Sequence, residues 1–219
     1  MSIHQKIRTF YGKGTDEHHR NRSWEHCYCY FRNTGRDGLA ADRDHAALQL
    51  GFYLASWGMY RGSGFLLKHA YTVHQRVIDL IAESRFGGLW GADFGARETD
   101  DRFVPTIIEL ANGIRQSYPS QPTDTLITKI VLGTFACLPA CDRYFIHGFE
   151  HEGLRYSGLN DKFVERVLNF CRPRLDDLHR EQANIEESSG IRYPLMKLVD
   201  MYFHQIGSER VRKSRILLK

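Results

Sequence analysis

One aspartate near the middle of the chain, Asp142, has surroundings that suit a carboxylate for chemistry. It follows the apolar phrase FACLPAC and precedes RYFIHG. Because Pro139 disfavours helical geometry at Leu138, we expect one helix to end there and another to begin at Asp142, which would cap it through the amides of Tyr144 or Phe145. Helix capping alone explains such a residue. A carboxylate fixed at a helix start is also placed to stabilise positive charge or to activate water.

The segment before the proline must position this aspartate. Residues 123–135 are apolar on nearly every side, which is typical of a helix buried inside a core. Thr123 or Asp124 can cap its start. We therefore expect a central helix that leads through a proline turn to Asp142.

A second unit of two helices precedes this one. Residues 46–60, capped by Asp42 or Asp44, carry an apolar helical stripe together with small residues that allow close approach of a backbone or a ligand. The glycines of YRGSGF then end this helix, and Ser63 can cap another that runs to about residue 80. A plain turn explains this phrase, and a phosphate held by free amides beside Arg61 is the alternative.

The remaining apolar patterns are also helical. Helices are expected over residues 103–115, 160–170, 173–187 and from 194 towards the end of the chain. No stretch predicts a convincing sheet, so the predicted fold is all-α with about eight helices. Residues 1–38 are read as a basic, aromatic N-terminal segment and residues 39–219 as the helical domain. Within the former, residues 24–31 fit a helix or a strand, and residues 33–38 resemble a turn.

Composition narrows the class of protein. The formal charge is +4, but cations crowd the last ten residues, where they fit a phosphate backbone or form a solvated tail. Five cysteines without a signal peptide indicate reduced thiols and a cytoplasmic location, and their spacing predicts no metal site. No apolar run is long enough to span a bilayer, so we expect no membrane contact.

The sequence of residues 127–145, ITKIVLGTFACLPACDRYF, resembles a segment of the helix-hairpin-helix DNA glycosylase superfamily. In that segment a core helix leads through a proline turn to the catalytic aspartate, and the likeness is greatest to compact 8-oxoguanine-glycosylase-like members of bacteria and archaea. The resemblance implies a helix-hairpin-helix glycosylase-like fold, a catalytic role for Asp142, no cofactor, and double-stranded DNA with modified bases as the partner of a monomeric enzyme.

The chain also departs from that family. The stretch before the core helix, PSQPTDTL, lacks the glycine-rich hairpin that grips a phosphate, and the proline stands one residue further from the aspartate than in the best-known members. The nucleophilic lysine of bifunctional members would fall near Thr123, whereas Lys129 comes half a helix later. The resemblance therefore implies a monofunctional enzyme that uses water. No four-cysteine iron–sulfur cluster is present in the sequence.

Such an enzyme needs aromatic surfaces for a flipped base and cations for the DNA backbone. The residues expected to bind the substrate are Trp24, Trp57, Tyr60, Arg61, Ser63 and Trp90. Those expected to contact the backbone are Lys129, Arg143, Arg210, Arg212, Lys213 and Arg215. Some bacterial enzymes of this type excise glucosylated hydroxymethylcytosine from phage DNA, and the glycine-containing segments 60–64 and 86–95 would leave room for such a bulky base.

Two other classes of function remain open. An RNase built on an R-x(4–6)-H motif is one, since Arg20 with His26 and Arg174 with His179 match that spacing, although 11 histidines make chance matches common. A helical module that binds nucleic acid or protein without catalysis is the other. It would need the aromatic and basic residues but not Asp142.

Overall fold

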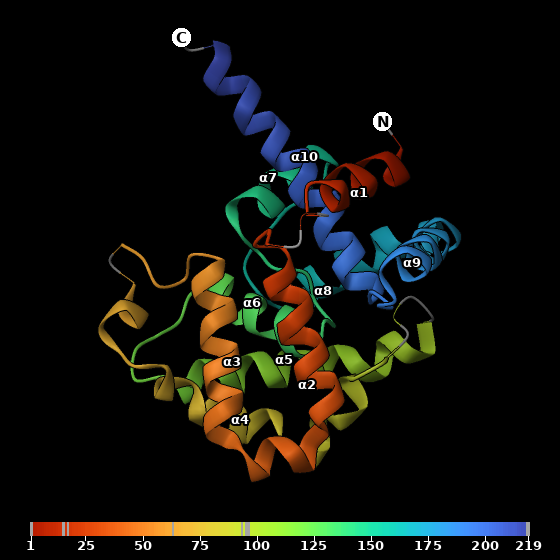
Figure 1. The fold of residues 1–219 in the computed structure, drawn as a ribbon. Helices are drawn as coiled ribbons and strands as arrows, with labels where there is room; N and C mark the ends of the chain where they lie inside the picture. The colour runs from red at the N-terminus through yellow and green to blue at the C-terminus, as the bar shows by residue number, and fades with distance from the viewer. Residues whose placement is uncertain are drawn as a thin grey trace.

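Every regular element in the described part of the chain is helical. The computed structural model describes residues 2–14, 16, 18–62, 64–92, 94 and 97–217. Within these residues there are ten α-helices and four short 3-10 helices (Figure 1). The all-α prediction is confirmed, with more helices than expected. None of the described helices is both long and apolar enough to cross a membrane.

The elements follow one another without a strand in the described residues. The α-helices are α1 (Ile3–Gly12), α2 (Arg22–Ala41), α3 (Arg43–Ser56), α4 (Gln75–Ile81), α5 (Arg97–Ser117), α6 (Asp124–Thr134), α7 (Arg143–His151), α8 (Asp161–Cys171), α9 (Leu175–Ser189) and α10 (Leu195–Leu217). The 3-10 helices are η1 (Phe65–Lys68), η2 (Tyr71–His74), η3 (Ser84–Leu89) and η4 (Arg172–Arg174).

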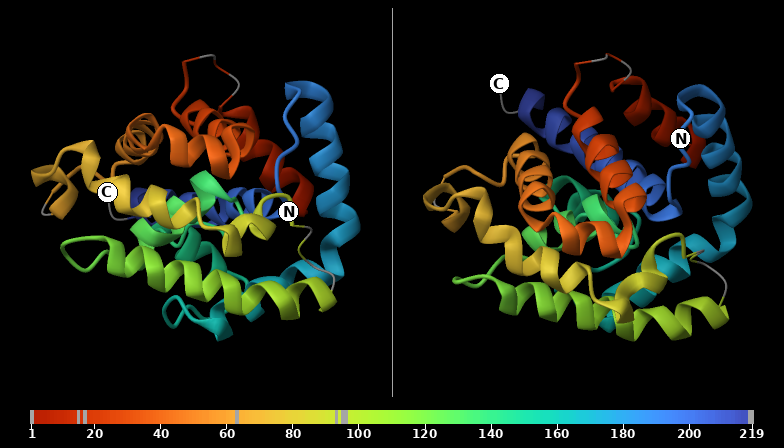
Figure 2. Two further views of the ribbon diagram at one scale, coloured as in Figure 1. Left: turned by 90° about the horizontal axis from the view of Figure 1, so that it is seen from below. Right: turned by 60° about the horizontal axis from the view of Figure 1, so that its bottom comes forward.

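Helix α6 is the buried helix that the sequence predicts. Every residue from Leu126 to Thr134 is buried, and α2, α3 and α5 all pack on this helix. Figure 2 shows α6 between α2 and α3 on one side and α5 on the other. A Cβ on Gly133 would lie 2.5 Å from the ring of Tyr53, so only glycine lets α3 come this close. The helix that leads to Asp142 is thus held from several directions.

Helices α7 and α10 touch through their backbones. A Cβ on Gly148 would lie 2.0 Å from the carbonyl oxygen of Phe203, and a Cβ on Gly207 would lie 1.8 Å from that of Tyr144. Two glycines, one on each helix, therefore allow an approach that any larger residue would block. This contact sets the N-terminus of α7, and with it Asp142, directly against one face of α10. The C-terminal turns of α10 extend past α7 at the top of Figure 1.

Several predicted boundaries were wrong. Helix α3 ends at Ser56 rather than near residue 60, because Gly58 adopts the left-handed conformation (φ 74°) just beyond it. Residues 65–80 form two 3-10 turns and the short α4 rather than one helix, since the extended backbone at His69 and Ala70 separates the turns. Helix α5 begins at Arg97, well before the predicted start at residue 103.

The N-terminal segment is helical throughout its aromatic part. Trp24, Tyr28 and Phe31 lie on one face of α2 and join the same buried core as the rest of the chain, which settles the choice between helix and strand for residues 24–31. The turn predicted at residues 33–38 is present only as a break at Gly35 (φ 62°, ψ 176°), after which the helix resumes. Glycine alone adopts that backbone conformation without strain.

Candidate active site

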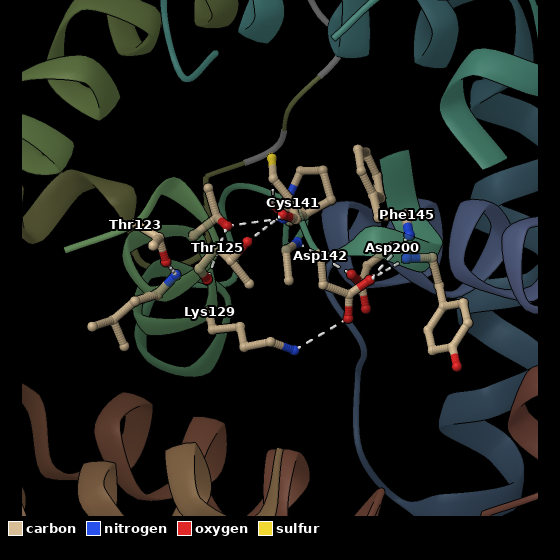
Figure 3. A network of polar contacts seen from close by, with 12 residues as sticks. Thr123, Thr125, Lys129, Cys141, Asp142, Phe145 and Asp200 are labelled. Carbon is tan, nitrogen blue, oxygen red and sulfur yellow. Dashed lines mark hydrogen bonds and ion pairs between the residues drawn. The ribbon is translucent and has the colours of Figure 1, made fainter. Parts of the chain in front are cut away.

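Asp142 caps α7 as the sequence predicts. Its Oδ1 accepts hydrogen bonds from the amides of Tyr144 and Phe145, each at 3.0 Å, while Oδ2 lies 3.3 Å from Nζ of Lys129 (Figure 3). Burial by itself raises the pKa of this carboxyl, but the Lys129 ammonium, the nearby His204 and the amide of Phe145 together lower it below its ordinary value. Asp142 is therefore ionised at neutral pH, and 18% of its side chain is exposed.

Lys129 does not lie on the surface where a phosphate contact was expected. Only 5% of its side chain is exposed, and its Nζ lies between Oδ2 of Asp142 and the ring of Trp57, 5.0 Å from the ring centroid. In Figure 3 the side chain extends from α6 towards the aspartate. This lysine therefore holds and neutralises Asp142 rather than facing solvent.

The proline turn between α6 and α7 is fixed from both sides. On the α6 side, Thr125 donates to the carbonyl oxygen of Cys141 and Thr128 accepts from its amide, both at 2.8 Å. On the α10 side, Oδ1 of Asp200 accepts from the amide of Ala140 at 3.1 Å (Figure 3). The backbone on either side of Asp142 is thereby positioned before any ligand arrives.

Helix α10 contributes three polar side chains that the sequence analysis missed. Lys197, Asp200 and His204 recur at helical spacing in the first, mainly apolar turns of α10, and that spacing is the signal that could have found them. Nζ of Lys197 lies 2.9 Å from Oδ2 of Asp200, and both side chains are buried. The same ammonium lies 4.9 Å from the ring centroid of Trp24 and 5.6 Å from that of Trp57. A second ion pair thus lies beside the Lys129–Asp142 pair.

These groups surround one small pocket. Its cavity volume is about 10 Å³, and it is lined by Tyr53, Trp57, Lys129, Leu132, Ala140, Asp142, Lys197, Asp200 and His204. Two polar atoms of its lining, Nε1 of Trp57 and Nδ1 of His204, are buried without a hydrogen-bond partner among the described residues. This volume is far below the range of about 300–1,000 Å³ typical of small-molecule sites, and it is about the space that one water molecule needs.

The other predicted aromatic residues lie elsewhere. Trp24 is buried, stacks on Tyr28 and donates its Nε1–H to the carbonyl oxygen of Leu132 at 2.9 Å, so it is part of the core. Trp90 packs on Phe135 with ring centroids 4.4 Å apart and is partly buried. Neither ring lines the pocket of Asp142; of the predicted tryptophans, only Trp57 does.

The YRGSGF turn is also separate from the pocket lining. The hydroxyl of Tyr60 forms a hydrogen bond with Nε2 of the buried His74 at 2.6 Å. Arg61 is exposed, and a Cβ on Gly58 would contact its guanidinium. Ser63 lies outside the described residues, so its expected role in capping or phosphate binding is not addressed by the structure.

Cations are found on the surface near the site. Arg143 is exposed and lies over the ring of Tyr144, and the guanidinium of Arg20 lies 5.2 Å from the ring centroid of Trp57. Arg210 contacts His151, and Arg212 is exposed further along α10. Lys213 and Arg215 continue this helix, but their side chains lie outside the described residues.

Charges of both signs meet where α1 packs on α10. Burial lowers the pKa of Lys13, the carboxylate of Glu209 raises it, and the cations of Arg212 and Lys6 lower it further. Lys6 is itself ion-paired with Glu209.

The arginines of the alternative R-x(4–6)-H motif contact aromatic rings. Arg174 donates to the carbonyl oxygen of Phe170 and its guanidinium lies 4.1 Å from the centroid of that ring. Arg20 lies over Trp57, whereas its motif partner His26 is exposed.

No group of three or more histidine, cysteine or acidic side chains within the described ranges could hold a metal ion.

Comparison of the chain with protein-family models, with curated proteins and with solved structures finds no match.

Proposed function

We propose that this protein is a monofunctional DNA glycosylase with a helix-hairpin-helix glycosylase-like arrangement around Asp142. It would hydrolyse the N-glycosidic bond of a base that has left the double helix. The observation that carries the proposal is the state of Asp142: a capped, ion-paired and ionised carboxylate at the end of a proline turn, with part of its surface open. The family resemblance of residues 127–145 falls on this same helix, turn and cap.

The chemistry asked of Asp142 is electrostatic. As the bond between C1′ and the base breaks, positive charge develops on the sugar ring, and a fixed carboxylate stabilises that charge. Because its hydrogen bonds and ion pair hold it in place, it need not reorganise during the reaction. Lys129 keeps the carboxylate oriented and ionised, and Asp200 fixes the turn that carries it.

Substrate entry requires Trp57 to move. The pocket is smaller than a nucleoside, and the indole of Trp57 forms one of its walls. Trp57 directly follows the last residue of α3. In the segment that comes next in the chain, Gly58 and Gly62 both have positive φ (74° and 62°), so this segment turns at two glycines. Displacement of this indole by the sugar of a flipped nucleotide would widen the pocket and leave the ring free to stack on the base.

Surface charge supports a polyanionic partner. Arg20 lies over Trp57 at the pocket, Arg143 directly follows the proposed catalytic aspartate, and Arg212 lies on the extended end of α10. Together they would contact phosphates on a duplex whose target nucleotide enters beside Trp57. The basic end of α10 would replace the glycine-rich hairpin that the family uses to grip the backbone.

The proposed substrate is a modified base, with glucosylated hydroxymethylcytosine of phage DNA as the first one to test. Removal of such a base would leave abasic sites in the phage genome and act as an antiviral defence. The aromatic and charged surroundings of Trp57 would suit a polar, bulky base better than a compact apolar one.

The test is base release from three DNAs: phage DNA with glucosylated hydroxymethylcytosine, phage DNA with unmodified cytosine, and a synthetic duplex with 8-oxoguanine. Abasic sites are detected with an aldehyde-reactive probe. Asp142→Asn keeps the helix cap, because asparagine caps as well as aspartate, but removes the charge. We expect it to lower the rate by about 10²–10³-fold.

The matched control is Asp161→Asn, which alters an exposed acid in the first turn of α8. It should leave the rate unchanged. Equal rates for wild type and Asp142→Asn, or no abasic sites on any of the DNAs, would contradict the proposal. Degradation of RNA that His179→Ala abolishes and Asp142→Asn does not would select the RNase alternative instead.

A further inference from the structure

His204 lines the pocket with a ring nitrogen for which core packing in the described part of the chain provides no hydrogen-bond partner. It lies on α10, and its ring is held edge-on between Phe10 and Tyr144, at centroid distances of 5.2 and 5.0 Å. Those contacts fix the plane of the imidazole but satisfy neither nitrogen. Nδ1 is buried without a hydrogen-bond partner among the described residues, and the side chain lines the pocket that contains Asp142. A buried nitrogen without a partner costs free energy unless a water or a ligand occupies the space beside it.

The pocket contains a second buried polar atom without a partner from the described ranges, and this atom is a hydrogen-bond donor rather than an acceptor. Nε1 of Trp57 carries a hydrogen, can only donate, and is likewise buried without a partner among the described residues. The pocket thus presents one unused donor and, from a neutral imidazole, one unused acceptor. A water molecule placed between them would accept from Trp57 and donate to His204, and buried waters make two to four such bonds.

Most of the lone pairs of Asp142, in contrast, are already used. Oδ1 accepts two backbone amides and Oδ2 faces the ammonium of Lys129. A carboxylate held in this way stabilises charge well, but it is a weak acceptor for a further proton. The groups that could remove a proton from water in this pocket are therefore Asp200, which is engaged by the Ala140 amide and Lys197, and His204.

Charged groups from three elements face His204. Asp142 lies at the start of α7, Lys129 on α6, and Asp200 and Lys197 on α10 itself. Burial lowers the pKa of His204, the two carboxylates raise it and the two ammonium groups lower it, so that the pKa lies below its ordinary value. The ring is consequently neutral at neutral pH and one of its nitrogens can accept a proton.

We infer that His204 is the general base of the proposed hydrolysis and that Asp142 remains an electrostatic stabiliser throughout. This inference rests on the proposed function. In the step, an O–H bond of the bound water breaks and its proton moves to Nδ1 of His204, while the water oxygen bonds to C1′ of the sugar. The bond between C1′ and the base breaks, and its electron pair leaves with the base. The imidazolium then returns the proton to the departed base, so one water is added in total and His204 is regenerated.

The first test is a pH profile of base release under single-turnover conditions. The variants are His204→Gln, which keeps a polar side chain but accepts no proton, and the control His147→Gln, an exposed histidine of α7. We expect His204→Gln to lower the rate by about 10²-fold or more and to abolish the fall in rate on the acid side of the profile. DNA affinity should not change, and His147→Gln should behave as wild type.

This test separates the two claims. An unaltered rate and pH profile in His204→Gln, with Asp142→Asn inactive on the same DNA, would overturn the role of His204 alone. Equal rates for wild type and Asp142→Asn would instead remove the proposed function, and the role of His204 with it.

A second measurement does not depend on activity. Nitrogen-15 spectra of the histidine rings in the free protein, assigned by the signal lost in His204→Gln, report which nitrogen carries the proton. We expect a neutral ring at pH 7 with Nδ1 unprotonated, and a further fall in its pKa in Asp142→Asn, since the carboxylate that raises the pKa is then absent. An imidazolium at pH 7, or a proton resident on Nδ1, would overturn the inference.

Discussion

Nζ of Lys129 lies 3.3 Å from Oδ2 of Asp142, and both side chains are largely withdrawn from solvent. Removal of one member of such a pair leaves a buried charge without a partner, which costs more than the pair contributes. Lys129→Met should therefore lower the free energy of unfolding by about 3 kcal/mol. In the double variant with Asp142→Asn the loss should be smaller than the sum of the two single losses, as measured by urea unfolding. Additive losses would show that the two groups are not coupled.

The close contact of α7 with α10 gives a second prediction. Because a Cβ on Gly207 would lie 1.8 Å from the carbonyl oxygen of Tyr144, Gly207→Ala must push the two helices apart. We expect a loss of at least about 3 kcal/mol or failure to fold. Gly12→Ala is the control, since a Cβ there meets nothing within 4 Å and alanine favours a helix. Equal stability of Gly207→Ala and wild type would contradict the described packing.

The local part of the site could be predicted from the sequence, because its determinants are neighbours in the chain. Thr123, the apolar run of α6 and Asp142 act over a few residues each, and the structure has both caps where expected. The helix itself ends at Thr134, earlier than the break predicted at Leu138, and Ala136 beyond it has a positive φ of 52°. The part of the site that α10 contributes could not be predicted. Asp200 and His204 line the pocket of Asp142 only because α10 packs against α7. A polar spacing on one helix does not say which distant residue it faces.

Long-range packing also explains the wrong assignments. Lys129 was expected to contact the DNA backbone, but it is buried and paired with the carboxylate of Asp142. Lysine is rarely fully buried unless it is paired in this way. Trp24 was expected to face a substrate, but its indole N–H donates to the carbonyl oxygen of Leu132, a partner no local pattern reveals. In residues 65–74 the extended backbone at His69 and Ala70 divides the predicted helix into two short turns.

The proposed displacement of Trp57 can be observed directly. With 5-fluorotryptophan incorporated, the fluorine resonance of Trp57 is assigned by its loss in Trp57→Phe. Addition of a duplex with the target base should shift this resonance, because the ring leaves Lys129 and Lys197 and meets the base. The resonance of Trp24, buried against Tyr28, should stay in place. A Trp57 signal that does not respond to saturating DNA would exclude the displacement.

Stability should depend on pH through His74. Burial lowers the pKa of this histidine from 6.5 to about 4, and both ring nitrogens bond to tyrosine hydroxyls, those of Tyr60 and Tyr118. Between these two pH values the unfolded chain binds a proton that the folded chain does not. The stability is therefore complete above pH 6.5 and falls as the pH is lowered towards 4, by about 3 kcal/mol in all.

The measurement is the urea midpoint as a function of pH for wild type and His74→Gln. The variant should be less stable at pH 7 but should lose less stability between pH 6.5 and 4. His26→Gln, which alters an exposed histidine, serves as the control and should keep the wild-type slope. An identical slope in His74→Gln would show that another group titrates in this range.

The central claim, that the charge of Asp142 promotes cleavage of an N-glycosidic bond, is tested most directly by mass spectrometry of free base released from phage DNA carrying glucosylated hydroxymethylcytosine. Wild type should release the intact modified base and leave a matching number of abasic sites, and Asp142→Asn should release it about 10²–10³-fold more slowly while binding the DNA equally well. Release of the base at the wild-type rate by Asp142→Asn would contradict the account.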